Sequence, residues 1–237
     1  MLSQYKILSF LSVLFARQFE LPDNTQITND MLAKFTLFDA KPIFQNVPEN
    51  FPPEIPRIVL LNQKKNLILE VAKSQINLKQ MFSPPADPDS SFTEFLKLLL
   101  KINNYFAEFS NVKFIRTGFI VQLFYEMGKS VNQHLAHYFF GDKKPLGDKP
   151  VNELHVNALH KLSLKDGTQV NRWLRFRPLR SAPPKQLDWA LMIEIDINSL
   201  PEESYDKDLN FISNFFQNSF DHIKNDIDIL NNKYFIS

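Results

Sequence analysis

The chain has 237 residues, of which 44% are hydrophobic and 22% charged, and its formal net charge is +1. This composition excludes wholesale disorder and a protein that is basic throughout, so any charge-driven function must be local. The absence of cysteine excludes disulfides, thiol catalysis and cysteine-ligated metals. The chain has five glycines and neither a GxGxxG nor a Walker pattern, which disfavours a phosphate-binding loop.

Residues 5–19 are apolar at successive positions, which predicts a strand covered on both faces. The same run, behind Lys6, has the apolar character of a short signal-peptide core. However, Leu14 and Ala16 do not make a small-x-small cleavage site, and Arg17 follows at once. The run is also about half of the roughly 20 residues that span a bilayer. We therefore expect a buried strand in a cytoplasmic protein with no membrane contact.

A short helix and a hairpin are predicted next. Residues 28–38 carry apolar side chains at helical spacing, with Thr28 or Asn29 as the expected N-cap. A proline-rich, extended segment follows, and residues 57–61 and 67–73 then predict the two strands of a hairpin.

Two long amphipathic helices are predicted, over residues 91–109 and 206–230. Each places its apolar residues on one continuous stripe, which must lie against a sheet or another helix. The first is expected to begin at Ser91, which has a glutamate at capping-box spacing. Between the two helices, residues 112–127 predict a strand and residues 131–140 a short helix.

Residues 155–200 have the longest strand alternation in the chain and predict three consecutive strands. An Asp-Gly pair at positions 166–167 predicts the turn between the first two. The second strand, residues 169–177, is expected to end at Pro178, and the third covers residues 187–198.

Residues 1–110 and 111–237 repeat the same order of elements, which predicts one compact domain, spanning residues 1–237, made of two similar halves. The short helices share an Asn-x-x-Leu-Ala pattern beginning at Asn29 and Asn132, and the hairpin turns keep the same spacing. A chance match is the alternative. The predicted fold is α+β, with two β-α-β-β(-β)-α halves whose mainly antiparallel sheets join edge to edge and pack on two long helices. The strand of residues 187–198 has no counterpart in the first half in this interpretation.

A cluster of arginines with an aromatic neighbour is the first candidate site, for nucleic acid. It consists of Arg172, Trp173, Arg175, Arg177 and Arg180. Its composition resembles that of a sheet surface that stacks bases and neutralises phosphates. Strand alternation places Arg172 on one face and Arg175 and Arg177 on the other. The simpler interpretation, favoured by the low net charge, is that the arginines cover an exposed face or pair with acidic residues around the last helix, such as Asp226.

Histidines give the second candidate site. His134 and His137 are three residues apart on a predicted helix, and either His155 or His160 could complete a metal site with them. This spacing is not a known metal signature, so ordinary surface or core histidines are the simpler interpretation, and no metal is expected.

Two carboxylates give the third candidate site. Glu194 and Asp196 share one face of a predicted strand, as a pair for acid–base or metal chemistry would. A half-exposed strand face is the simpler interpretation. Without a nucleophile motif we expect no catalytic residues and no cofactor.

Several segments resemble a sporadically distributed family of bacterial proteins of about this length, which has no assigned activity. They are Phe51-Pro52-Pro53, the hairpin of residues 57–73, Phe114-Ile115-Arg116-Thr117-Gly118, the run from Leu191 to Ile197, and Phe220-Asp221. The resemblance implies no functional residues. The patchy distribution of that family implies accessory genes, such as phage-defence cargo.

The function expected from the sequence is therefore that of a non-catalytic binding or interaction protein with a protein partner, its sheet surface serving as the contact area. One alternative is a nucleic-acid-binding module that uses Arg172 to Arg180. A further alternative is an enzyme with an unrecognised site near Glu194, Asp196 or the histidines.

Overall fold

A computed structural model describes residues 5–17, 24–82, 88–110, 112–126, 131–141, 153–180, 188–200 and 208–233. The strands are β1 (Lys6–Ala16), β2 (Ile43–Phe44), β3 (Ile58–Asn62), β4 (Leu67–Val71), β5 (Gln75–Met81), β6 (Phe114–Glu126), β7 (Val156–Ser163), β8 (Gln169–Arg180) and β9 (Asp188–Ser199). The helices are α1 (Asn24–Lys34), α2 (Pro88–Ser110), α3 (Val131–Phe140) and α4 (Leu209–Lys233).

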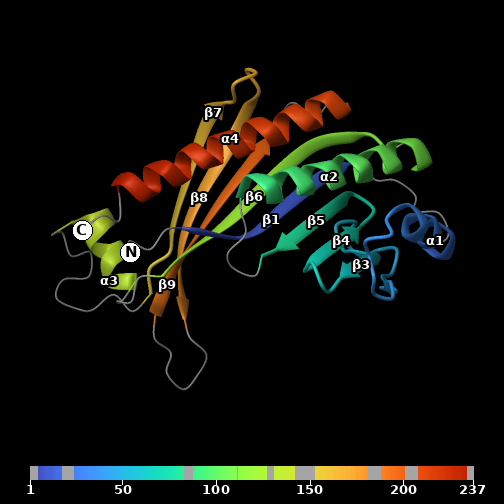
Figure 1. The fold of residues 1–237 in the computed structure, drawn as a ribbon, viewed down its shortest axis with the longest axis horizontal. Coiled ribbons are helices and arrows are strands. Elements are labelled where there is room, and N and C mark those ends of the chain that lie inside the picture. The colour runs from blue at the N-terminus through green and yellow to red at the C-terminus, as the bar shows by residue number, and fades with distance from the viewer. Residues whose placement is uncertain are drawn as a thin grey trace.

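The strands form one nine-stranded sheet in the order β2-β3-β4-β5-β1-β6-β9-β8-β7. All pairings are antiparallel, and β1 and β6 lie side by side in its middle. Helices α2 and α4 lie across the same face of the sheet (Figure 1). The expected α+β class, the antiparallel sheet and its packing on two long helices are therefore confirmed.

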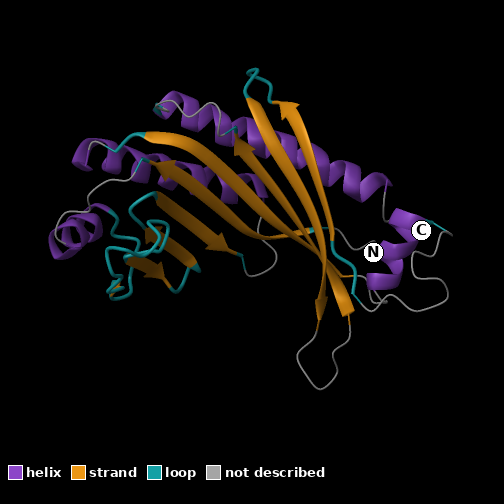
Figure 2. Cartoon of the chain, turned by 180° about the vertical axis from the view of Figure 1, so that it is seen from behind, coloured by secondary structure: helices purple, strands orange, loops and turns teal. Residues whose placement is uncertain are grey.

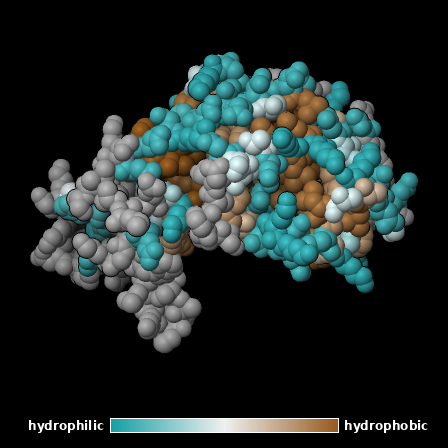
Figure 3. Space-filling model, in the orientation of Figure 1, coloured by the Kyte–Doolittle hydropathy of each residue, from teal (hydrophilic) through white to brown (hydrophobic). Residues whose placement is uncertain are grey.

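The two long helices bury the apolar stripes that the sequence predicts. In α2, Phe92, Phe95 and Leu99 are buried, and in α4 Phe216 and Phe220 are buried. Figure 3 shows this side of the molecule, where polar residues form bands over the helices and apolar residues lie between them. Burial of these stripes, rather than helix propensity alone, holds the helices in place.

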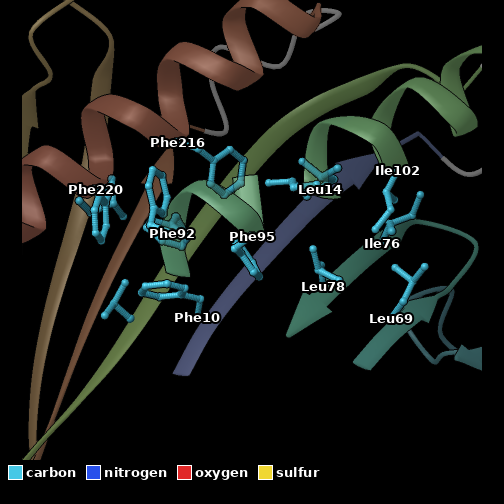
Figure 4. Close-up of a cluster of buried hydrophobic side chains, with 14 of the residues drawn as sticks. Phe10, Leu14, Leu69, Ile76, Leu78, Phe92, Phe95, Ile102, Phe216 and Phe220 are labelled. Carbon is cyan, nitrogen blue, oxygen red and sulfur yellow. The ribbon is translucent and has the colours of Figure 1, made fainter. Parts of the chain in front are cut away.

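An aromatic cluster joins the sheet to both helices. The Phe10 ring on β1 lies 5.5 Å from that of Phe95 on α2 and 5.9 Å from that of Phe220 on α4, measured between centroids. The rings of Phe92 and Phe220 stack directly, with centroids 3.9 Å apart. Figure 4 shows these side chains converging between the helices and the central strands. Each such pair adds about 0.5–1.5 kcal/mol to what burial of its area contributes.

Strand β8 is longer than predicted, because Pro178 does not end it. Pro178 pairs with Leu191 of β9, and the strand continues to Arg180. The pairing of β8 with β7 stops at Phe176, so the last part of β8 has only one neighbouring strand among the described residues. Proline lacks an N–H donor and is tolerated at such an edge.

Two predicted helix starts are wrong. Helix α1 begins at Asn24, which places the expected cap residue Thr28 inside it. Ile27 is buried one turn before Met31, so the apolar series begins earlier than the predicted helix. Helix α2 begins at Pro88, so Ser91 lies within its first turn. Proline favours the first helical position because its φ is already helical and its missing N–H would have no helical partner.

One strand of the first half was missed. β5 was not predicted, although Ile76 and Leu78, both buried, alternate with polar residues as in a half-buried strand. It pairs with β1 as β9 pairs with β6. β5 thus has the position next to β1 that β9 has next to β6, although no strand of the first half was expected to match residues 187–198.

Candidate functional site: the open face of the sheet

The sheet has one face covered by helices and one face that they leave open. On β1, Phe10 and Leu14 point to the helices and are fully buried, whereas Leu11 and Val13 point to the opposite side and are half-buried. Figure 2, seen from that side, shows the long strands with no helix in front of them. We call this surface the open face. The prediction that β1 is covered on both sides is wrong, and its surplus apolar side chains lie on the open face.

A row of polar side chains crosses the open face at right angles to the strands. Ser9 of β1, Gln122 of β6, Glu194 of β9 and Arg175 of β8 are consecutive partners in the strand register. Ser9 Oγ donates to Gln122 Oε1 over 2.9 Å, and Gln122 Nε2 donates to Glu194 Oε2 over 3.0 Å. Arg175 Nη1 completes the row by donating to Glu194 Oε1 over 2.6 Å. We call this row, with Asp196 beside it, the polar row.

Arg175 binds both of the carboxylates that the sequence singled out. Its Nη1 lies 2.6 Å from Glu194 Oε1 and 3.0 Å from Asp196 Oδ2. The side chains of Arg175, Glu194 and Asp196 are 21%, 14% and 9% exposed. One guanidinium therefore serves two largely buried carboxylates, and the group as a whole carries one more negative than positive charge.

Burial raises the pKa of Asp196, and the hydrogen bond and charge of Arg175 act in the opposite direction. The amide of Asn198 also donates to Asp196 Oδ1. Both oxygens of Asp196 are thus occupied, as is required of a carboxylate held away from water.

Trp173 contacts Arg175 of the polar row, and Gly118 lies beside Asn198, which contacts Asp196. The guanidinium carbon of Arg175 lies 5.3 Å from the centre of the Trp173 ring, within the range of a cation–π interaction. A Cβ atom on Gly118 would lie 2.5 Å from Asn198 Oδ1. Glycine at this position leaves room for the asparagine that positions Asp196.

Arg172, on the same strand, belongs to the other face. Its Nη1 donates to Asp226 Oδ1 on α4 over 2.6 Å and contacts His222 Nε2 at 3.2 Å. Burial raises the pKa of Asp226 and lowers that of His222. The simpler interpretation from the sequence, that arginines pair with acidic residues around the last helix, is confirmed for Arg172 and Asp226.

Arg175 and Arg177 lie on the opposite face of the sheet from Arg172. Arg177 is half-buried and is the register partner of Met192, so it shares the open face with Arg175. Arg180 pairs with Asp188 beyond a shift in register, and its side chain lies outside the described residues. The structure therefore does not bring the five residues together on one surface.

The structure does not gather the candidate histidines into one metal site among the described residues. His155 Nε2 lies 3.1 Å from Glu153 Oε1, and His160 borders a cavity beside α3. His134 and His137 lie on α3. In the part of the chain that the structure describes, no group of three or more His, Asp or Glu side chains is placed to hold a metal ion.

Sequence reasoning missed Ser9 and Gln122. Each is a polar residue in a largely apolar strand, and nothing local marks it as part of a network. Only the register between β1, β6 and β9, strands far apart in the sequence, brings these two side chains to Glu194. Asn198 is different, because it lies two residues from Asp196 on the same face of β9 and strand alternation alone places it there.

Comparison with known proteins adds little. No family model matches the chain, and no curated protein matches it. Among solved structures, the TBP of Methanococcus jannaschii is similar at 12% sequence identity, over 94% of this chain and 99% of that one, with a TM-score of 0.26. A TM-score this low carries no argument about the fold or function of this chain. Among the described residues, no helix has the length and apolar character needed to cross a membrane.

Proposed function

We propose that the protein is a non-catalytic binding protein whose open face contacts a protein partner. The observation that carries the proposal is the open face itself, where apolar side chains flank the polar row and none of the described helices covers them. Leu11 and Ile120 lie side by side in the register, next to Asp196. Apolar surface of this kind, bordered by polar groups, is typical of contact areas between proteins.

The charge of the polar row favours a protein partner over a nucleic acid, whose phosphates need free positive charge. Arg175 is already engaged by Glu194 and Asp196, so its charge is not free to neutralise a phosphate. The pair of carboxylates leaves a small excess of negative charge at the centre of the face. A partner surface with apolar residues around a hydrogen-bond donor or a basic side chain matches this pattern.

The proposal is tested with two variants that introduce the same residue on opposite sides of the molecule. Ile120→Arg places a charge in the middle of the open face, next to Asp196, and Asn210→Arg places one on exposed α4. Affinity capture from the cells that make the protein should yield a defined protein that accompanies the parent and Asn210→Arg and is lost with Ile120→Arg. Equal recovery with both variants would contradict the proposal.

Nucleic-acid binding remains the second candidate because Arg177 and Trp173 share the open face. Its test is filter binding of RNA and DNA at low salt, with Arg177→Glu as the variant, because Arg177 can be changed without breaking the ion pairs of Arg175. Salt-dependent binding by the parent that this variant loses would favour the nucleic-acid module. No binding by the parent at low salt would remove that candidate.

We infer further that the two halves arose by duplication. The strand order supports this: outward from the central pair β1 and β6, the sheet reads β5-β4-β3 on one side, followed by the two-residue edge strand β2, and β9-β8-β7 on the other. Under this inference α1 corresponds to α3 and α2 to α4. A role in a bacterial accessory or defence system, implied by the family resemblance, is a separate proposal. A partner gene that accompanies this one in many genomes would support that role.

A further inference from the structure

A cavity of about 180 Å³ lies on the helix-bearing side, away from the open face, between α3, β7, β8 and the end of α4. Phe176 lines it from β8, and the alternation of that strand sends Arg175 to the opposite side. A role for the cavity is therefore independent of the open face.

The walls of the cavity are mainly apolar and include three aromatic rings, those of Tyr138, Phe139 and Phe176. Its inner part is formed by Leu135, Phe176 and Leu230, which are 1%, 6% and 5% exposed. At its mouth lie Tyr138 and Phe139, which are 40% and 37% exposed. These two aromatic side chains leave apolar surface exposed to water beside the cavity. A ligand bound in the cavity would cover that surface.

The size of the cavity limits what it can accept. An apolar cavity of about 150 Å³ binds a molecule of the size of benzene. Sites for drug-sized ligands begin at about 300 Å³. The cavity therefore fits one aromatic ring, and the rings of Phe139 and Phe176, in edge-to-face contact at 5.3 Å, offer it both faces and edges for packing.

One side of the mouth is polar. His160 lines the cavity from β7, is exposed to solvent, and is the register partner of Arg172. Arg172 is held by Asp226, one helical turn before Leu230. A ligand substituent at the mouth thus meets the imidazole of His160, which can donate a hydrogen bond, while the carboxylate of Asp226 is paired with Arg172 through Oδ1.

We propose that this cavity binds a small molecule with a single aromatic ring and an oxygen-bearing substituent, such as an aromatic carboxylate. The ring occupies the space between Leu135, Phe176 and Leu230, and the substituent oxygen accepts a hydrogen bond from His160. About ten non-hydrogen atoms at a typical contribution per atom give a dissociation constant in the millimolar range.

The test is a ¹⁹F NMR titration of the full chain with 4-fluorobenzoate as the probe. The parent should show saturable binding, and Ala158→Phe, which fills the cavity from β7, should abolish it. Asn157→Phe, on the opposite face of the same strand, is the matched control and should bind as the parent does. If Ala158→Phe fails to fold, as judged by circular dichroism, the smaller Ala158→Leu serves in its place.

Two further measurements distinguish the contribution of the aromatic ring to binding from that of its substituent. His160→Gln should weaken 4-fluorobenzoate several-fold and leave fluorobenzene unchanged. Absence of saturation in the parent, or equal binding by the cavity-filled variant, would overturn the site. Equal weakening of both probes by His160→Gln, or of neither, would overturn the assigned role of His160.

Discussion

Removing the guanidinium of Arg175 should destabilise the protein more than any other single change on the open face. Arg175→Met keeps the length of the side chain but leaves Glu194 and Asp196, 14% and 9% exposed, without a counter-charge. Breaking a buried ion pair by removing one partner costs about 3–5 kcal/mol. Because water reaches part of this group, we expect a loss of about 2–4 kcal/mol at pH 7.

The assay is urea unfolding, in which a loss of this size lowers the midpoint by roughly 1–2 M if the slope is about 2 kcal/mol per M. The control is Lys161→Met. Lys161 is an exposed cation on β7 that lies on the same face of the sheet as Arg175. The triple variant Arg175→Met, Glu194→Gln, Asp196→Asn should recover more than half of the loss, because no uncompensated charge is left in it.

The pH dependence of the stability of Arg175→Met is a second test of the role of Arg175. Burial already raises the pKa of Asp196 with Arg175 present, and without Arg175 that pKa rises further. A raised carboxyl pKa means that the folded state binds a proton more readily than the unfolded chain, so stability is gained as pH falls. The deficit of Arg175→Met should therefore shrink between pH 7 and about pH 4. A deficit at pH 7 within about 0.5 kcal/mol of that of Lys161→Met would refute the reasoning.

Three further predictions concern the fold around the polar row and the helix clamp. Gly118→Ala should lose about 1–3 kcal/mol in urea unfolding because its Cβ would meet Asn198 Oδ1 at 2.5 Å, and adding Asn198→Ala should restore part of it. Phe220→Ala should lose about 3–5 kcal/mol, since its ring stacks between α4 and α2, and an unchanged midpoint would count against the aromatic cluster. Burial lowers the pKa of His222, so its protonation disfavours the folded state. His222→Gln should consequently lose less stability than the parent as pH falls below about 6.5, whereas parallel curves would contradict the assignment.

The helices and the second half of the sheet could be predicted because their signals are local. The stripes of α2 and α4 have the helical period, and an Asp-Gly pair marks the turn between β7 and β8. In that turn Gly167 has φ +86°, a conformation that glycine adopts without strain. Strand alternation also placed Arg172 and Arg175 on opposite faces correctly.

The polar row could not be predicted, for a physical reason. It depends on which residues of β1, β6, β8 and β9 become neighbours, and a shift of one residue would turn every side chain to the other face. The sequence presented Glu194 with Asp196, and Arg175 with its cluster, as two separate candidate sites. The register brings Arg175 together with both carboxylates and leaves Arg172 on the other face.

The most direct test of the central claim is site-specific photo-cross-linking in the cells that make the protein. A benzophenone side chain in place of Leu11 lies on the open face, and one in place of Lys97 lies on the exposed side of α2. We predict a defined protein adduct from the Leu11 position that Ile120→Arg abolishes, and none from the Lys97 position. The same adducts from both positions, or only nucleic acid at the Leu11 position, would contradict it.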